Sequence, residues 1–423
     1  MKKISLKYII IFFGAALLFF SNDINSQILK KNGGSVYSIF GVGDINYSMS
    51  SRSDAMGIMG IALPGTYINS LNPAMWTGIQ HTTFSTGFNL DKIKSSDGTV
   101  SANRTYGNFE SFNFAVPIDR EHGWVFNAGL HTYSVVSYDL LSRGSSDEQT
   151  YTHAFSGEGG LSRISLGLSY TLFKVLNTGV QFNYIFGNIN SENRIVWDDA
   201  SLFNTDNQTD NSLFGYYFNA GLAFHGFDKL FKSKSLSNLH VGALFSTPMK
   251  MTSNISARYD RVSGADSVNI TDGTLNLPLA FGFGISNEFN NNLVVSSDFY
   301  YQNWANYKYY GSHPNEFKNC YIIGAGLEWT PSRKFEDGLI KTTSYRIGGN
   351  YNSGYLTISG HSVSSFGASL GVSLRLSRLN NLDINFAYKR RGTTADGLVL
   401  DNYYRLGLGI DLGEFWFIRS SGY

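Results

Sequence analysis

The sequence predicts an all-β fold: a transmembrane antiparallel β-barrel of about fourteen strands. Three observations lead to this prediction. Charged residues are scarce while aromatic residues are common. Large apolar side chains alternate with small or polar ones over most of the chain, with the period of two that a strand requires. Short and long connections follow one another in turn, as they do at the two ends of an outer-membrane barrel.

The composition fits a chain of many strands. Charged residues make up 15% of it, against roughly a quarter in an average soluble domain. The 45 glycines, 32 phenylalanines and 26 tyrosines suit crowded strands better than helices, which these residues disfavour. A net charge of +1 gives no electrostatic basis for binding nucleic acid, so none is expected as a partner.

Metal sites, cofactors and catalytic residues are not expected. Cys320 is the only cysteine, which excludes an intrachain disulfide and a metal site built on thiolates. The eight histidines are scattered, without an HxxxH or HxH pair, and are interpreted as isolated residues. We find no GxSxG elbow, Walker loop or HExxH helix and predict that the protein is not an enzyme. A Ser–His–acid set built from distant strands is the alternative, and no spacing supports it.

The N-terminus predicts a secretory signal peptide over residues 1–26. Lys2, Lys3 and Lys7 precede an apolar run over residues 8–20, which is too short for a spanning helix of roughly 20 residues. We place the cleavage after Ser26, and the absence of a cysteine there argues against a lipoprotein signal. A membrane anchor is the alternative interpretation.

Alternation is clearest in two segments. Residues 163–172 (RISLGLSYTL) place large apolar side chains on one face, including Leu166 and Leu168, and small ones such as Ser165 on the other. Residues 366–376 repeat the pattern, with Leu370 and Val372 opposed to Gly371 and Arg375, and so do 382–388 and 404–412, where Leu406 and Leu408 oppose Asp383 and Arg405. We expect the apolar face to contact lipid and the other to line the lumen, since a soluble sandwich would carry more Lys and Glu outside.

Counting such runs gives the strands. We expect them near 81–94, 103–116, 123–141, 152–172, 179–190, 211–225, 239–253, 274–289, 293–304, 319–330, 342–353, 363–378, 382–391 and 402–412. Several connections after even strands are short, although 226–238 and 331–341 are exceptions. Those after odd strands are often long and polar, as in 190–211 and 253–273. The asymmetry predicts periplasmic turns, extracellular loops and both termini on the periplasmic side.

Eight charged side chains belong to the inward face by the same alternation. They are Asp298, Glu328, Arg346, Arg375, Asp383, Lys389, Arg405 and Asp411. An Arg or Lys on the lipid face would cost about 2–4 kcal/mol at mid-depth, so the lumen is the favourable place for them. Two interpretations stay open: salt bridges that pack the interior, and a polar path for a substrate.

The region before the first strand carries a resemblance. Residues 35–44 (SVYSIFGVGD), 51–62 and 70–79 (SLNPAMWTGI), together with 389–417, resemble the FadL-like outer-membrane transporters of long-chain fatty acids (OMPP1/FadL/TodX type). That family has a fourteen-stranded barrel and an Asn-Pro-Ala motif before the first strand, which corresponds here to Asn72, Pro73 and Ala74. The C-terminal pattern is similar to a divergent branch, whose substrates need not be fatty acids. No ligand-pocket residue of better-known members can be carried over by motif.

The resemblance implies that residues 27–80 form a hatch inside a barrel of residues 81–423. The implication is physically sound, because a barrel of this size leaks unless its lumen is filled, and irregular backbone at membrane depth must be surrounded by protein or water. Phe40, Met49, Met56 and Met59 are candidates for hatch contacts with a ligand, since Met adapts to varied shapes. Packing against the wall is the alternative for the Met residues.

Two functions follow, both in the bacterial outer membrane. The first is passive, hatch-gated uptake of a hydrophobic small molecule such as a long-chain fatty acid, by a monomeric barrel surrounded by outer-membrane lipid. The second is a FadL-fold barrel that acts as a partner of an outer-membrane protein secretion machinery and holds a subunit or cargo with its long loops. An open porin is disfavoured by the hatch. The aromatic residues of 300–311 could grip a ligand at the outer rim or form the interfacial girdle, and we favour the girdle.

Overall fold

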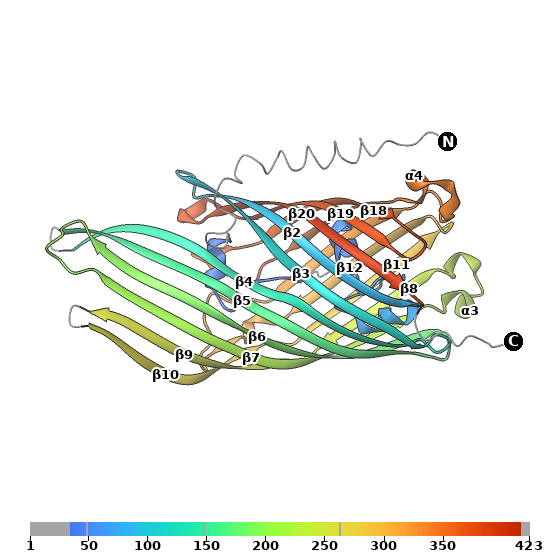
Figure 1. Ribbon diagram of the computed structural model, residues 1–423, viewed down its shortest axis with the longest axis horizontal. Coiled ribbons are helices and arrows are strands. Elements are labelled where there is room, and N and C mark those ends of the chain that lie inside the picture. Colours follow the sequence, from blue (N-terminus) through green and yellow to red (C-terminus); the bar gives the residue numbers. More distant parts are fainter. Residues whose placement is uncertain (1–33, 48–49, 147–148, 262–263, 416–423) are drawn as a thin grey trace.

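The computed structural model is a single elongated barrel of tilted strands, with the segment from residue 34 up to the first wall strand folded inside it (Figure 1). The structure describes residues 34–47, 50–146, 149–261 and 264–415. The predicted signal peptide and the first residues of the predicted hatch lie outside these ranges. Among the described residues no helix is both long enough and apolar enough to span a membrane.

The wall is a closed ring of fourteen antiparallel strands, which confirms the predicted fold. Two of the fourteen are each interrupted once, so that β8 continues as β9 and β10 continues as β11. The ring closes where β2 pairs with β20, from Thr82↔Glu414 to Ser96↔Leu400. The strands are β2 (Thr82–Ser96), β3 (Ser101–Asp119), β4 (Trp124–Ser146), β5 (Gln149–Leu172), β6 (Leu176–Trp197), β7 (Thr205–Phe224), β8 (Leu239–Ser246), β9 (Met249–Arg261), β10 (Gly264–Leu277), β11 (Ala280–Phe289), β12 (Leu293–Gln302), β14 (Cys320–Trp329), β15 (Ser344–Asn352), β18 (Ser365–Arg375), β19 (Asn381–Gly392) and β20 (Leu400–Glu414).

Short elements complete the chain. The hatch, by which we mean residues 34–80 as described, contains η1 (Val36–Ile39), β1 (Asp44–Ile45), α2 (Ser51–Ala55) and η2 (Pro73–Gly78). The connections hold α3 (Phe227–Phe231), η3 (Lys234–Leu236), η4 (Trp304–Asn306), β13 (Lys308–Tyr309), η5 (Phe335–Asp337), α4 (Leu339–Thr342), β16 (Thr357–Ile358), β17 (His361–Ser362) and η6 (Ala395–Gly397).

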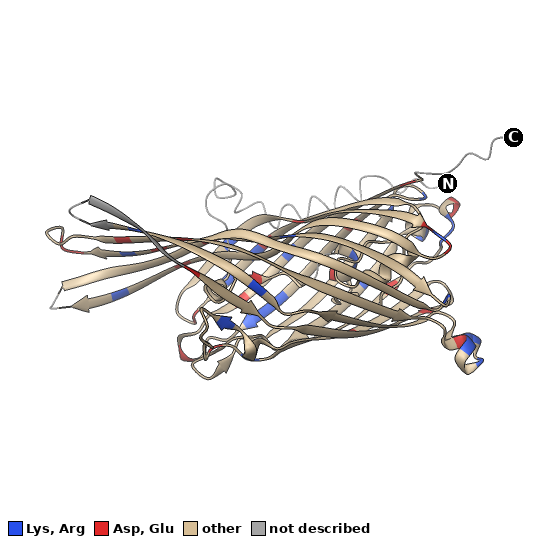
Figure 2. Ribbon diagram, turned by 90° about the horizontal axis from the view of Figure 1, so that it is seen from below, with Lys and Arg blue, Asp and Glu red and all other residues tan. Residues whose placement is uncertain are grey.

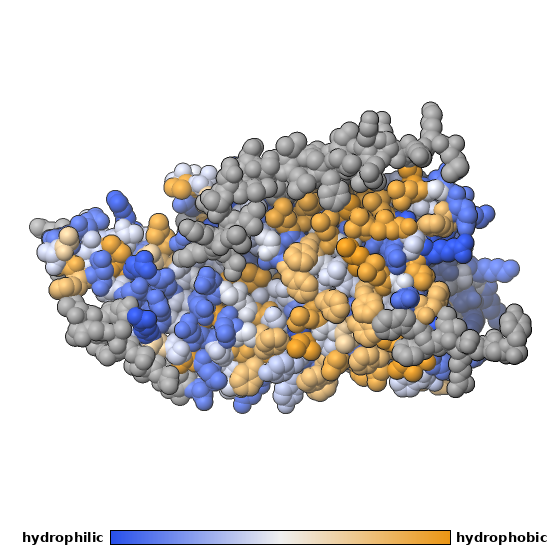
Figure 3. All heavy atoms as spheres, in the orientation of Figure 1, coloured by the Kyte–Doolittle hydropathy of each residue, from blue (hydrophilic) through white to orange (hydrophobic). Residues whose placement is uncertain are grey.

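The two faces of the wall differ as a membrane barrel requires. Leu166 is 44% exposed and Leu370 is 49% exposed on the outside, whereas Ser165 and Asp383 are buried on the inside. Leu406 shares the outward register and packs there against other apolar side chains of β18, β19 and β20. Apolar residues form a broad band on the face seen in Figure 3, with hydrophilic residues beyond it at both ends. The protein is therefore an outer-membrane barrel.

One part of the prediction was wrong: residues 190–211 and 253–273 are mainly strand, not loop. The β6–β7 ladder continues to Ile195↔Thr205, and β9 and β10 pair as far as Arg261↔Gly264. With the outer parts of β4 and β5, these hairpins form one curved sheet in the order β4-β5-β6-β7-β9-β10, which extends beyond the rest of the barrel (Figure 1). We call it the projecting sheet. Both of its faces lie in water, so the apolar alternation that marks a strand is lost there.

The wall has a break between β3 and β4. Their ladder runs only from Asp119↔Trp124 to Ser111↔His131, although β3 begins at Ser101 and β4 continues to Ser146. The hairpins β2–β3 and β4–β5 diverge from this point (Figure 1). We call the space between residues 101–110 and 132–146 the seam. Part of it is closed by the hatch, because β1 pairs with β4 at Asp44↔Val135 and Ile45↔Ser134.

Spin labels test which part of the wall lies in lipid. Single cysteines replacing Leu166 and Leu370 on the barrel should give labels accessible to oxygen and protected from a water-soluble nickel relaxant. A label replacing Leu141, which is 74% exposed on the projecting sheet, should show the reverse. All three side chains point outward, so the substitutions should leave the fold intact. Nickel accessibility at Leu166 equal to that at Leu141 would contradict the assignment of the membrane band.

Candidate functional site: the lumen and its hatch

The hatch backbone lies directly against glycines of the inner wall. A Cβ atom added to Gly326 or to Gly348 would overlap the carbonyl group of Met56, and one added to Gly221 would overlap the side chain of Asn72. Hatch atoms come within 3 Å of such a Cβ at nine further glycines of the wall strands: Gly167, Gly179, Gly242, Gly282, Gly284, Gly324, Gly371, Gly392 and Gly409. A residue with a side chain at these positions would displace the hatch.

Asn72, Pro73 and Ala74 lie at the start of η2, against β7. The Asn72 side chain accepts a hydrogen bond from the Ala74 amide (3.0 Å) and donates one to the Ile61 carbonyl (2.6 Å). Pro73 occupies the first turn of the helix, where its missing N–H costs nothing. Asn72 is fully buried, so its amide group satisfies backbone groups that would otherwise be stranded, each at a cost of roughly 1–3 kcal/mol.

Asn69 and Trp76 support this turn, and the sequence analysis missed both. The Asn69 side chain accepts hydrogen bonds from the amides of Leu71 (2.9 Å) and Asn72 (2.8 Å) and donates one to the Gly60 carbonyl (2.5 Å). The fully buried indole of Trp76 donates to the Asn69 carbonyl (2.5 Å). Their positions on either side of the Asn-Pro-Ala motif were the sequence feature that could have identified them.

A chain of four buried charges links the hatch to three wall strands. Arg52 of α2 donates two hydrogen bonds to Glu328 of β14 (2.7 and 2.8 Å). Arg346 of β15 donates to the same carboxylate (2.7 Å) and to Asp383 of β19 (2.8 Å). Each charge therefore faces a partner of opposite sign in a site closed to solvent. We call Arg52, Glu328, Arg346 and Asp383 the ion-pair chain.

Two further charges that were predicted to face the lumen bind groups inside the barrel. Asp298 is buried and accepts hydrogen bonds from the amides of Gly60 (2.5 Å) and Ile61 (3.1 Å), so it holds the hatch by its backbone. Arg405 pairs with Asp91 of β2 through two hydrogen bonds (2.8 and 3.2 Å).

The remaining three lie in different settings. The Lys389 ammonium lies 4.1 Å from the centre of the Tyr403 ring. Asp411 is half-buried and stands opposite Ser85 in the ladder of β20 with β2. Arg375 donates to the carbonyls of Arg333 and Arg378 (2.9 and 3.1 Å), so it braces the connections at the barrel end and not the middle of the lumen.

Two other hatch-to-wall contacts come from residues that the sequence analysis did not single out. The buried Arg163 of β5 donates to the carbonyl of Ser70 (3.0 Å), and Arg391 of β19 pairs with Asp44 (2.5 Å). Arg163 is the first residue of the segment 163–172 and shares the inward face with Ser165, so the alternation described for that segment would have identified it.

The proposed ligand contacts of the hatch separate into two groups. Met56 is fully buried among Ile58 and Leu63, and Phe40 packs against the largest apolar cluster of the lumen. Met59 lines a cavity. Met49 lies outside the described residues.

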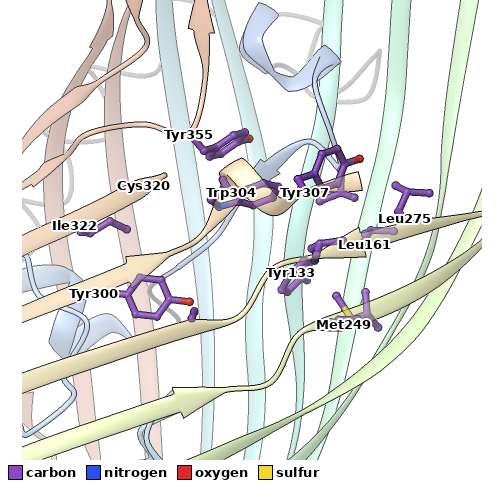
Figure 4. Packing of buried hydrophobic residues seen from close by; sticks show 14 of the residues in the cluster. Tyr133, Leu161, Met249, Leu275, Tyr300, Trp304, Tyr307, Cys320, Ile322 and Tyr355 are labelled. Carbon is purple, nitrogen blue, oxygen red and sulfur yellow. The ribbon is translucent and has the colours of Figure 1, made fainter. Parts of the chain in front are cut away.

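The favoured assignment of residues 300–311 to an interfacial girdle was wrong for Tyr300, Trp304 and Tyr307. All three are buried in the lumen, where Trp304 stacks on Tyr355 with ring centres 4.5 Å apart (Figure 4). Trp304 and Tyr307 belong to the connection after β12, which folds inward at η4, where alternation gives no guidance. Tyr300 lies within β12 on the same face as Asp298, so alternation already placed it inside. This aromatic cluster therefore fills the lumen next to the hatch.

One cavity inside the barrel is polar on one side. Its volume is about 260 Å³, and it lies between the hatch and strands β2, β3, β18, β19 and β20. Apolar side chains including Ile58, Met59 and Ile322 line part of it. Its charged residues are Asp44, Asp54, Asp91, Glu110, Lys389, Arg391 and Arg405. We call it the main cavity, and it adjoins the seam, since Phe109 and Thr132 also line it. Figure 2 shows Lys, Arg, Asp and Glu positions gathered on neighbouring ribbons toward the end that carries the projecting sheet.

A family model decides the membership of the chain. The BamG model matches residues 6–421, almost the whole sequence. The chain belongs to the BamG family. Among curated protein sequences none matches this BamG chain.

Solved structures share the fold of this BamG barrel at low sequence identity. The toluene transporter TbuX of Ralstonia pickettii is 15% identical with a TM-score of 0.60, over 88% of this chain and 99% of its own. A FadL homologue of Pseudomonas aeruginosa is 12% identical with a TM-score of 0.59, over 87% and 99%. The toluene transporter TodX of Pseudomonas putida is 14% identical with a TM-score of 0.56, over 89% and 100%. The predicted FadL-like fold is thus confirmed.

Removal of Arg346 tests the ion-pair chain. Arg346→Ala leaves the buried Asp383 without its partner, so we expect the barrel to lose about 3–5 kcal/mol of stability. The measurement is the temperature at which the compact barrel band is lost on semi-native gels. Arg378→Ala is the control, because the Arg378–Glu336 pair is largely exposed (77% and 68%) and should be worth less than about 1 kcal/mol. Equal melting of the two variants would show that the chain of charges does not stabilise the barrel.

Proposed function

We propose that this BamG barrel is a partner subunit in outer-membrane protein assembly and that it contacts other proteins through the projecting sheet. The projecting sheet is the observation that carries the proposal. It has two free edges, the outer parts of β4 and β10, and membership of the BamG family supports a link to outer-membrane assembly.

The chemistry of a free strand edge suits a protein partner. Beyond Asp139 the outer part of β4 faces the seam, and among the described residues no strand pairs with this side of it, so its backbone N–H and C=O groups suit pairing with an added strand. Among the described residues the hatch covers the first part of this edge, because β1 pairs with Ser134 and Val135 and the Ser137 amide donates to the Ser38 hydroxyl (3.0 Å). Further out, the Arg104 side chain donates to the Asp139 carbonyl (3.1 Å). β2 begins, and β20 ends, at the barrel end away from the projecting sheet. In bacterial barrels both termini lie on the periplasmic side, so the projecting sheet is on the extracellular side.

The lumen also fits a structural role. An apolar solute entering the main cavity would meet seven charged side chains, and burying apolar groups there displaces water from polar ones. Movement of the hatch would break the ion-pair chain and the contact of Asp44 with Arg391. Both features favour a barrel that stays closed while its outer sheet binds.

Shortening one hairpin tests this function. Replacing residues 193–207 by Asn-Gly keeps Glu192 opposite Gln208 and closes the hairpin with a two-residue turn. Crosslinking from a photoreactive residue at position 141, followed by mass spectrometry of native outer membranes, should identify a subunit of the assembly machinery with the full chain. The shortened barrel should lose most of this crosslink.

The matched control replaces residues 227–237 at the opposite end of the barrel by a short loop, and it should keep the crosslink. Loss of the partner only in this control would place the contact at the periplasmic end and overturn the role of the projecting sheet.

A second function, uptake of a hydrophobic small molecule, is favoured by the seam. The main cavity adjoins this break in the wall, which offers a sideways path between the lumen and the bilayer. The solved structures with this fold include two toluene transporters and a monoaromatic hydrocarbon channel. At about 260 Å³ the cavity is just below the size of typical ligand sites, so a single aromatic ring suits it better than a long acyl chain.

Blocking the seam tests uptake separately from assembly. Val135→Trp places a bulky side chain beside the main cavity, and we expect a several-fold fall in uptake of labelled toluene by cells that rely on this barrel. Val100→Trp is the control, at a turn position that is 68% exposed. Uptake that is the same in both variants, or absent in the unaltered barrel, would exclude this second function and leave the first untouched.

A further inference from the structure

Glu110 is turned into the lumen by a β-bulge. In the β2–β3 ladder, Gly87 pairs with Ser111 and Phe88 pairs with Phe109, so Glu110 is the extra residue on β3. A bulge of this kind re-aims one side chain, and here Glu110 and Ser111 are both buried in succession where strict alternation would place one outside. The carboxylate passes across Gly87, where an added Cβ would lie 2.5 Å from Oε2. The bulge lies directly beside the seam.

Four acceptor oxygens at this point have no donor among the described residues. They are both carboxylate oxygens of Glu110, Oδ2 of Asp54 and the amide oxygen of Asn89. Glu110 is 1% exposed and Asn89 is 4% exposed, so bulk water does not satisfy them. The carboxyl groups of Glu110 and Asp54 are within hydrogen-bonding reach of one another, and all three side chains line the main cavity. Two buried carboxylates this close repel unless a positive group lies with them.

The positive side chains around the main cavity already have partners. Arg405 of β20 binds Asp91 with two hydrogen bonds, and Arg391 of β19 binds Asp44. Lys389 lies over the Tyr403 ring. Arg405 also attracts Glu110 and Asp54, but its hydrogen bonds go to Asp91, so among the described residues Glu110 and the Asp54 Oδ2 atom have no hydrogen-bond donor.

We propose that Glu110, Asp54 and Asn89 form a binding site for a hard divalent cation, Ca²⁺ or Mg²⁺. Carboxylate and amide oxygens are the ligands these ions prefer, and waters in the main cavity would complete the coordination. Glu110 belongs to the wall and Asp54 to α2 of the hatch, so the ion ties the hatch to β3 beside the seam. The site stands independently of either function proposed above.

Titration calorimetry on chelator-treated barrel in detergent tests the site. Adding CaCl₂ or MgCl₂ should give saturable binding of one ion, and the bound ion should raise the melting temperature. Glu110→Gln and Asp54→Asn should each weaken binding at least about ten-fold and abolish this rise. Glu336→Gln and Asp97→Asn remove exposed carboxylates outside the site and should bind as the unaltered protein does.

Asp54→Asn keeps the wall intact, so it decides the question if Glu110→Gln fails to fold. Absence of saturable binding of either ion at millimolar concentration would overturn the proposal in favour of a proton shared by the two carboxyl groups. Equal binding by the unaltered protein and both site variants would assign the ion to the outer surface, which also overturns it.

Discussion

The direct contact between the hatch backbone and the inner-wall glycines is the constraint on which the structure depends. A barrel this wide must be filled, and wall side chains alone do not reach across it. Glycines on ten wall strands leave space for atoms of the hatch, as Gly221 does for the Asn72 side chain and Gly326 does for the Met56 carbonyl. The hatch is therefore packed as closely as a core, and its irregular path is possible only because the wall is smooth where it runs.

The charges of the lumen follow from that packing. Once water is excluded, each buried charge needs a partner, and the ion-pair chain supplies partners from the hatch and three wall strands. The Asp298 carboxylate likewise accepts hydrogen bonds from two hatch amides. The hatch is thus bound to the wall both by apolar contact and by electrostatics, and the two proposed functions place different demands on these contacts. Assembly with a partner leaves these pairs intact, whereas a solute taken up through the lumen must either pass beside them or break them.

The seam and the projecting sheet have one origin. Where β3 stops pairing with β4, one edge of β4 becomes free, and the strands from β4 to β10 continue outward together. The same place holds the bulge at Glu110, the pairing of β1 with β4 and the main cavity. The free edge for a protein partner, the lateral path through the seam and the proposed cation site therefore all lie around a single irregularity in an otherwise regular wall.

The sequence by itself determined the barrel, its strand number and the inward face of most strands, because alternation reflects a wall with lipid on one side and protein on the other. It also located the hatch motif at Asn72. Only the tertiary structure decided which charges meet, since Arg52 and Glu328 are far apart in the chain. It likewise decided the burial of Trp304 and the inward turn of Glu110, because a folded-in connection and a one-residue bulge both break the period of two. Patterns along one strand record what each face touches, but partners across the lumen are set by closure of the ring and by the path of the hatch within it.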